Sequence, residues 1–233
     1  MKNLVKILFN KQFFSFYVSQ FLGTFNDNFF RTALATFIML GTVSLQPNTR
    51  ALITSLLITI FMLPYFLFSA TSGEISDKYR KDTVMKVVKG IQLLLTLVVL
   101  IGFLLKNVWI LLAVLFLMGL LSAIFSTAKY SAVPELLEHD QLIAGNSLIQ
   151  CGMYVAMLLG IVCGAIIYLV EAKWLYIVLY VVFFTVALIG FISSLFIPQL
   201  KSVNQTFEIS KNFIKQHGKI CLTLNIPEIF ICA

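Results

Sequence analysis

The sequence predicts an all-α integral membrane protein, built as a bundle of six transmembrane helices. Of its 233 residues, 60% are hydrophobic and only 12% are charged, and the mean hydropathy is +0.96. Soluble globular domains carry about 25% charged residues, so this chain has too little polar surface to be covered by water. A soluble enzyme, a nucleic-acid-binding protein and a disordered chain are therefore disfavoured, and the phospholipid bilayer is the expected surroundings.

Six apolar segments are each long enough to cross a bilayer, which takes about 20 residues in a helix. We expect spans at about residues 15–40, 51–71, 84–105, 108–128, 145–169 and 174–197. Each break between them is polar or helix-breaking: a turn cluster at 46–48, a charge run at 77–82, the pair 106–107, an acidic segment at 135–140, the triplet 171–173, and Pro198 after the last span. The first 200 residues thus form one six-span unit.

Lysine and arginine gather on one side of the predicted membrane. Of the 17 basic residues, only Arg50, Lys106 and Lys173 fall in the connections after the first, third and fifth spans, and Arg31 lies within a span. The others lie at the N-terminus, in or beside the second and fourth connections, and in the tail. Because basic residues concentrate on the cytoplasmic side, we expect both termini to be cytoplasmic.

The segment 201–233 differs from the spans before it. Its last apolar stretch, 220–233, is too short to cross a bilayer and contains Pro227 and Glu228. Four lysines make the rest of the segment basic: Lys201, Lys211, Lys215 and Lys219. We interpret it as a cytoplasmic basic linker followed by the stump of a seventh helix.

The first span carries charge deep in the membrane. Asp27 lies about 18 Å from the start of the span at 1.5 Å per residue, and an ionised side chain there costs at least about 2.5–3.5 kcal/mol. Arg31 follows one turn later, so the two side chains can pair. Asn26 and Asn28 widen this polar face. A structural ion pair would explain the spacing, but polar stripes within spans more often line a substrate path, which we favour.

Other polar residues lie in the later spans. Gln150 belongs to a stripe of the fifth span with Asn146 and Tyr154, and Lys129 ends the fourth span. Lys86 and Lys89, near the cytoplasmic end of the third span, are interpreted as interface anchors whose long stems reach the headgroups.

Two features of the spans predict packing rather than chemistry. Small residues recur every four positions in the fifth span and would let another helix approach closely: Gly152, Ala156, Gly160 and Gly164. Pro64 is expected to bend the second span.

No catalytic or metal-binding constellation is apparent in the sequence. There is no glycine-rich ATP-binding loop, and neither His139 nor His217 has metal-ligand spacing or an acidic partner placed for catalysis. The four cysteines have no zinc spacing. We therefore expect no enzyme activity, no metal and no cofactor.

The segment 73–82, between the second and third spans, resembles the loop signature of the major facilitator superfamily. Arg80 replaces the second glycine of that signature, and Asp82 replaces its last basic residue. The resemblance implies that a cytoplasmic gating loop is formed by Gly73, Asp77, Lys78, Arg80 and Lys81.

Three further segments, 20–34, 126–135 and 144–146, are similar to the lysophospholipid transporter branch of that superfamily. The resemblance implies a secondary transporter of the bacterial inner membrane that moves lysophospholipid, chiefly lysophosphatidylethanolamine, by alternating access. It assigns the headgroup amine to Asp27, and a phosphate or a gating carboxylate to Lys129. Arg31 would position Asp27 or meet the phosphate. Asn26, Asn28 and Gln150 complete the expected binding residues, and Gln150 stands where the family often has glutamate.

Family members have twelve spans in two similar halves, with the site between the halves. The resemblance therefore identifies this chain as the N-terminal half, with a second six-helix half or another copy of itself as the partner, or as a truncated fragment that does not transport. A transporter of another amphipath or drug is a further alternative. The acyltransferase that is fused to some members is disfavoured, because its His-x4-Asp motif is absent.

Overall fold

The computed structural model describes residues 10–40, 46–166 and 173–200, together with residue 7, and places six long helices in them. No strand is present in these ranges. The helices are α2 (Lys11–Met39), α3 (Pro47–Lys78), α4 (Lys81–Leu104), α5 (Val108–Leu136), α6 (Leu142–Ile166) and α7 (Lys173–Leu195), with a short 3-10 helix η1 (His139–Gln141) before α6. The linker and helix stump expected at 201–233 lie outside the described residues.

The fold class is the one expected from the sequence, a multi-pass helical membrane bundle. Helices α3, α4 and α5 and the stretch His139–Ile166 are long and apolar enough to cross a membrane. Several helices run past the apolar segments that predicted them: α3 extends to Lys78 and α5 to Leu136. An apolar stretch marks only the part of a helix that lies in the hydrocarbon core. The helix itself continues into the headgroup region for as long as its backbone hydrogen bonds continue.

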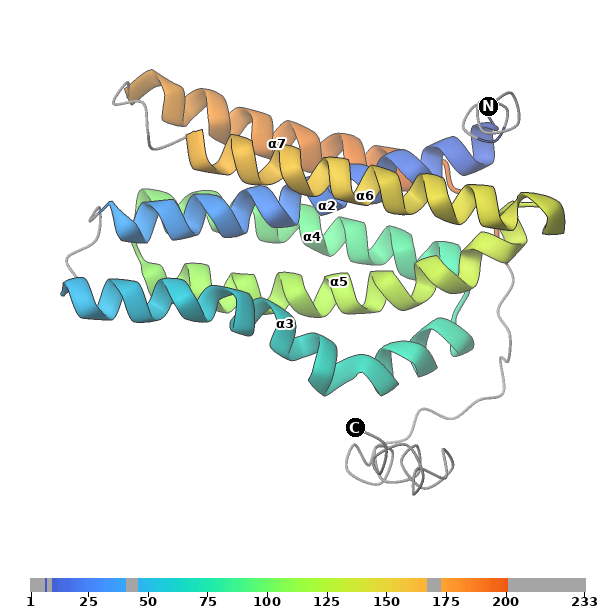
Figure 1. Ribbon diagram of the computed structural model, residues 1–233, viewed down its shortest axis with the longest axis horizontal. Helices are drawn as coiled ribbons and strands as arrows, with labels where there is room; N and C mark the ends of the chain where they lie inside the picture. Colours follow the sequence, from blue (N-terminus) through green and yellow to red (C-terminus); the bar gives the residue numbers. More distant parts are fainter. Residues whose placement is uncertain (1–6, 8–9, 41–45, 167–172, 201–233) are drawn as a thin grey trace, which may run out of the picture.

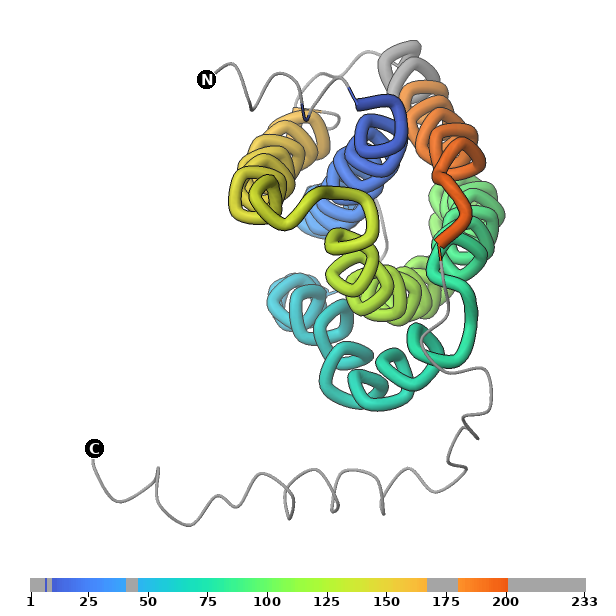
Figure 2. Tube along the Cα trace, turned by 90° about the vertical axis from the view of Figure 1, so that its right-hand side faces the viewer, coloured from blue at the N-terminus to red at the C-terminus, as the bar shows by residue number. Residues whose placement is uncertain are grey.

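The helices alternate in direction, and their connections gather at two ends (Figure 1). The α3–α4 connection and η1 lie at the end where α2 begins, and the α4–α5 connection lies at the other. Viewed along the bundle, neighbours follow the order α6, α2, α7, α4, α5, α3 (Figure 2). Helices α6 and α3 thus end an incomplete ring, and α2 and α5 face each other across it.

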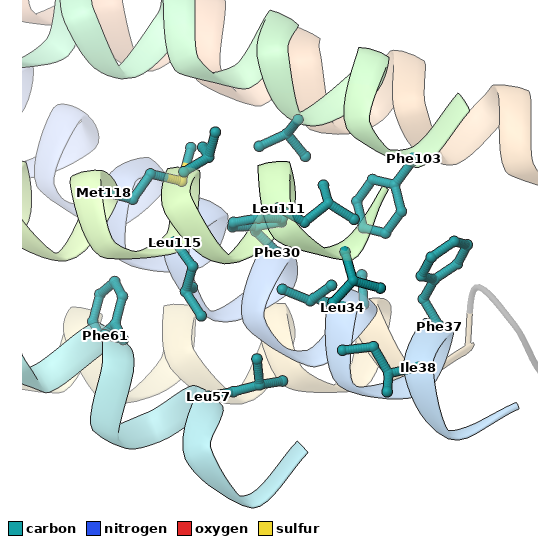
Figure 3. Packing of buried hydrophobic residues seen from close by; sticks show 14 of the residues in the cluster. Phe30, Leu34, Phe37, Ile38, Leu57, Phe61, Phe103, Leu111, Leu115 and Met118 are labelled. Atoms are coloured by element: carbon teal, nitrogen blue, oxygen red, sulfur yellow. The ribbon is translucent and has the colours of Figure 1, made fainter. Parts of the chain in front are cut away.

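Two apolar clusters hold the ring together, one toward each end. The cluster in Figure 3 includes Phe30 and Phe37 of α2, whose rings meet Phe103 of α4 edge-on at 6.1 and 5.1 Å. The other cluster includes Phe16 of α2 and Met85 of α4. Between them the same helices carry polar side chains, so the polar layer lies at mid-helix.

The small-residue ridge of α6 packs against α2, as its spacing predicts. A Cβ on Gly160 would lie 2.5 Å from the Phe25 carbonyl oxygen, and one on Gly164 would lie 2.6 Å from that of Phe29. Such distances leave no room for a side chain, so backbone meets backbone along this contact.

Helix α3 is visibly bent (Figure 1), and Pro64 lies within it. Proline removes one helical hydrogen bond and displaces the preceding turn, which bends a helix. A Cβ on Gly119 of α5 would overlap the Phe61 carbonyl, so α5 accommodates the bend through a glycine.

Candidate functional site

A cavity of about 370 Å³ lies in the polar layer and is lined by side chains from the five helices α2 to α6. The charged residues of its lining are Asp27, Arg31, Lys89 and Lys129. Its apolar wall includes Phe61, Phe125 and three methionines, Met62, Met153 and Met157. Aromatic rings and flexible thioether side chains adapt to irregular apolar ligands, so the cavity combines a charged part with an adaptable apolar part.

Asp27 is the carboxylate of the cavity, but it does not pair with Arg31. One carboxylate oxygen accepts a hydrogen bond from Gln92 Nε2 at 2.7 Å, and the other accepts one from Ser122 Oγ at 2.6 Å. No ion pair joins Asp27 to Arg31 in the described residues. The expected pairing is therefore wrong, because donors from α4 and α5 hold the carboxylate across the bundle and not along α2.

Arg31 is held by its own helix and by α3. Its guanidinium donates to Asn28 Oδ1 at 2.7 Å and lies 5.7 Å from the centre of the Phe61 ring. Asn28 in turn donates to the Thr24 carbonyl at 2.8 Å. Asn28 therefore orients Arg31 toward the cavity, and both expected site residues do line it.

Lys89 is a site residue that the sequence reading assigned to the membrane interface. The structure buries it, with 6% of its surface exposed. Its ammonium donates to Gln92 Oε1 at 2.9 Å and lies 4.6 Å from the centre of the Phe125 ring. A Cβ on Gly23 would overlap this ammonium, so a glycine of α2 makes room for it. The anchor prediction is wrong for Lys89, whereas Lys86 stays partly exposed and pairs with Asp82 at 3.2 Å.

The spacing along α4 could have revealed Lys89. Asp82, Lys89, Gln92 and Thr96 are all buried and recur at helical intervals on one face of this span. A lysine that merely reaches the headgroups needs no polar neighbour deeper in the membrane, so the polar residues beyond it were the informative signal.

Lys129 also faces the cavity, as expected. It is 3% exposed; its ammonium lies 3.2 Å from the Met153 sulfur and 4.4 Å from the centre of the Tyr130 ring. Thioether sulfur is a weak acceptor, and the ring attracts a cation only through its quadrupole. Neither neighbour neutralises the charge of Lys129.

Two expected site residues lie outside this cavity. Asn26 is buried between α2, α4 and α7, where it lines a separate space of about 10 Å³ beside Lys89. Gln150 donates to the Tyr130 hydroxyl at 3.1 Å, so it reaches the cavity only through that tyrosine. The structure thus brings together four of the six expected residues and adds Lys89, Gln92 and Ser122.

The expected gating loop is largely helical. Gly73, Asp77 and Lys78 belong to the last turns of α3, and the connection to α4 is only Tyr79 and Arg80. Lys81 begins α4 and joins it to the end of α5, by donating to the Ser131 carbonyl at 2.9 Å and pairing with Glu135. Among these residues, Lys81 makes the cross-helix contact at this end.

Asp82, the residue that departs from the family signature, holds the segment after α7. Its carboxylate accepts a hydrogen bond from the Leu200 backbone N–H at 3.1 Å and pairs with Arg80 and Lys86. The start of α4 is thus tied both to α5 and to the segment after α7.

Replacing Gln92 with leucine should lower the free energy of unfolding by about 1–3 kcal/mol, because Asp27 and Lys89 each lose a buried hydrogen-bond partner. Denaturant unfolding of the detergent-solubilised protein measures the change. Gln12→Leu, at an exposed position of the same residue type, is the matched control. Equal stability of the two variants would contradict the role of Gln92.

Comparisons with known proteins agree with this architecture. The Major Facilitator Superfamily pattern matches residues 16–225. The chain is 28% identical over 220 residues to the lysophospholipid transporter LplT of Citrobacter koseri, covering 93% of this chain and 51% of that protein. It is 30% identical over 194 residues to the lysophospholipid transporter LplT of Salmonella heidelberg, and this match covers 83% of this chain and 44% of that protein. The chain thus spans about half the length of the curated relatives it matches, and no solved structure matches it significantly.

Proposed function

The chain belongs to the Major Facilitator Superfamily, and from this premise we propose that it moves a lysophospholipid across the bacterial inner membrane by alternating access. The curated relatives that it matches are lysophospholipid transporters. Superfamily membership favours a transporter over an enzyme. The lipid specificity and the transport activity are the parts that we propose.

The observation that supports this function best is the dual character of the cavity. A lysophospholipid joins one charged headgroup to one acyl chain, and the cavity joins four charged side chains to a wall of aromatic and methionine side chains. We propose that the headgroup enters the polar layer beside Asp27 while the acyl chain lies against Phe61, Met62 and Met157.

Three of the four charged side chains contact the headgroup in this arrangement. Asp27 accepts from a headgroup ammonium or hydroxyl, since its oxygens face the cavity between Gln92 and Ser122. Arg31 and Lys129 bind the phosphate, because a guanidinium or ammonium and a phosphate oxygen form charge-assisted hydrogen bonds. Asn28 orients Arg31.

Alternating access requires a second wall that moves against this one. We propose that a second six-helix half, or another copy of this chain, supplies it, as the two similar halves of such transporters do. The contacts of Lys81 with α5 and of Asp82 with the segment after α7 would then hold one end of the bundle rigid while the two walls rock.

Reconstitution of the purified chain in vesicles tests the proposal. We expect fluorescent lysophospholipid to move between leaflets faster than in empty vesicles, and short-chain lysolipids of different headgroups to compete with it better than amphipathic drugs do. Preferential competition by drugs would favour the alternative substrate class. Absence of both movement and saturable lysolipid binding would contradict the proposed function.

We also propose that both termini are cytoplasmic, which predicts the labelling of single cysteines in a background without the native cysteines. Leu105→Cys and Glu138→Cys place exposed thiols in the α4–α5 and α5–α6 connections, at opposite ends of the bundle. A membrane-impermeant maleimide added outside intact spheroplasts should label position 105 at least about tenfold faster than position 138, because cytoplasmic loops carry the basic residues. Faster labelling of position 138 would reverse the topology.

A further inference from the structure

The charges that line the cavity do not balance. Asp27 contributes one negative charge, whereas Arg31, Lys89 and Lys129 contribute three positive charges, and no other charged residue lines the cavity. A zwitterionic headgroup would leave this surplus of positive charge unchanged. A headgroup with net negative charge would reduce it.

The hydrogen-bond partners of these side chains do not offset the surplus of positive charge. Both oxygens of Asp27 already accept one hydrogen bond each from neutral donors, Gln92 and Ser122, so the carboxylate is stabilised before any ligand binds. The direct partners of the two lysines are neutral: Lys89 donates to an amide oxygen, and Lys129 lies against a thioether and a ring. Within the described residues, neither lysine forms an ion pair.

Burial makes this lack of counter-charge costly. Lys89 and Lys129 are 6% and 3% exposed, and an ion taken out of water is stabilised mainly by opposite charge and hydrogen bonds. An anionic ligand that enters the cavity would supply both. The cavity therefore favours ligands that carry negative charge.

We propose that the site prefers lysophospholipids whose headgroup carries net negative charge, and that Lys89 is the residue that sets this preference. The inference rests on the proposed function and narrows its substrate class. Lys89 is singled out because the proposed phosphate contacts use Arg31 and Lys129, which leaves its buried ammonium with only the Gln92 amide as a hydrogen-bond partner in the described part of the chain and the Phe125 ring beside it. Through that amide it also offsets the charge of Asp27.

Equilibrium binding to the full chain in phosphatidylcholine nanodiscs tests this preference. The probes are lysophosphatidylethanolamine, lysophosphatidylglycerol and lysophosphatidic acid with the same acyl chain. Since a unit charge within several ångströms of buried cations interacts strongly at the reduced permittivity of a protein, we expect the glycerol lipid to bind about tenfold more tightly than the ethanolamine lipid. Lysophosphatidic acid should bind at least as tightly as the glycerol lipid.

Variants assign the preference to Lys89. Lys89→Met should bring the affinity ratio of the glycerol and ethanolamine lipids close to one, whereas Lys89→Arg, which keeps the charge, should retain most of it. Lys86→Met is the matched control, because Lys86 lies three residues earlier on α4 and pairs with Asp82 outside the cavity. Its ratio should equal that of the unmodified protein.

Each outcome separates the two proposals. Equal affinity of the unmodified protein for all three lipids would overturn the charge preference and leave the proposed function standing. An unchanged ratio in Lys89→Met would overturn the role of Lys89. If Lys89→Met does not fold, the unmodified protein still decides the preference, and loss of the affinity ratio in Lys89→Arg, which keeps the charge, would contradict the role of Lys89. Absence of saturable binding of every lysolipid would overturn the proposed function itself.

Discussion

Replacing Asp27 with asparagine should abolish the movement of lysophosphatidylethanolamine while leaving membrane insertion intact. Asparagine has nearly the same size but no charge, and its amide nitrogen would face one of the two donors that now bind the carboxylate, Gln92 or Ser122. Hydrogen bonds to charged groups contribute about 1.5–3 kcal/mol each, so we expect transport to fall by at least about tenfold to a hundredfold. Initial rates in reconstituted vesicles measure the loss.

Asp140→Asn is the control for Asp27→Asn, because it removes an exposed carboxylate in η1 that does not line the cavity. Its transport rate should match that of the unmodified protein. In Asp27→Asn, the transport rate of lysophosphatidylglycerol, which has no amine, should fall less than that of lysophosphatidylethanolamine. Transport that is unchanged for the ethanolamine lipid would contradict the role of Asp27.

Substituting leucine for Gly160 should cause the largest loss of stability. A Cβ at this position already lies 2.5 Å from the Phe25 carbonyl oxygen, and backbone cannot move aside as a flexible side chain can. Overpacking a close contact costs about 1–3 kcal/mol and sometimes more. Helix α6 must therefore separate from α2, and we expect a loss of at least about 3 kcal/mol in denaturant unfolding, together with loss of transport.

Gly73→Leu provides the matched control for Gly160→Leu. Both glycines are helical, but no atom lies within 4 Å of a Cβ built on Gly73. The stability of Gly160→Ala should lie between those of the two leucine variants. Equal stability of Gly160→Leu and Gly73→Leu would show that α2 and α6 do not need backbone contact.

The helices and their packing could be predicted from the sequence because each leaves a local signal. Long apolar stretches indicate spans, four-residue spacing of small side chains indicates close packing of α6, and Pro64 lies in the bent helix. The ends of α3 and α5 were less predictable, because a helix can continue beyond the hydrocarbon region, where its residues are polar and the hydropathy no longer marks it. The signature at 73–82 therefore turned out to be mostly helical.

The candidate site could be predicted only in part. Asp27 stood out because a carboxylate at mid-span is costly, but its partners could not be read from α2 alone. Spacing along one helix suggests only neighbours such as Arg31, whereas Gln92 and Ser122 come from α4 and α5 and meet Asp27 through the tertiary fold. Lys89 was misjudged for the same reason: its depth is set by the glycine of α2 that it packs over, Gly23.

The central claim, that the polar cavity binds lysophospholipid, is tested most directly by a cysteine at Ser126 in a background without the native cysteines. Ser126 lines the cavity, whereas Leu117 of the same helix is exposed on the outer surface. We expect a charged maleimide to modify Ser126→Cys but not Leu117→Cys in membranes, and lysophospholipid to slow that reaction at least about tenfold, as a bound ligand should. A thiol at position 126 that does not react, or that reacts equally fast with and without lysophospholipid, would contradict the claim.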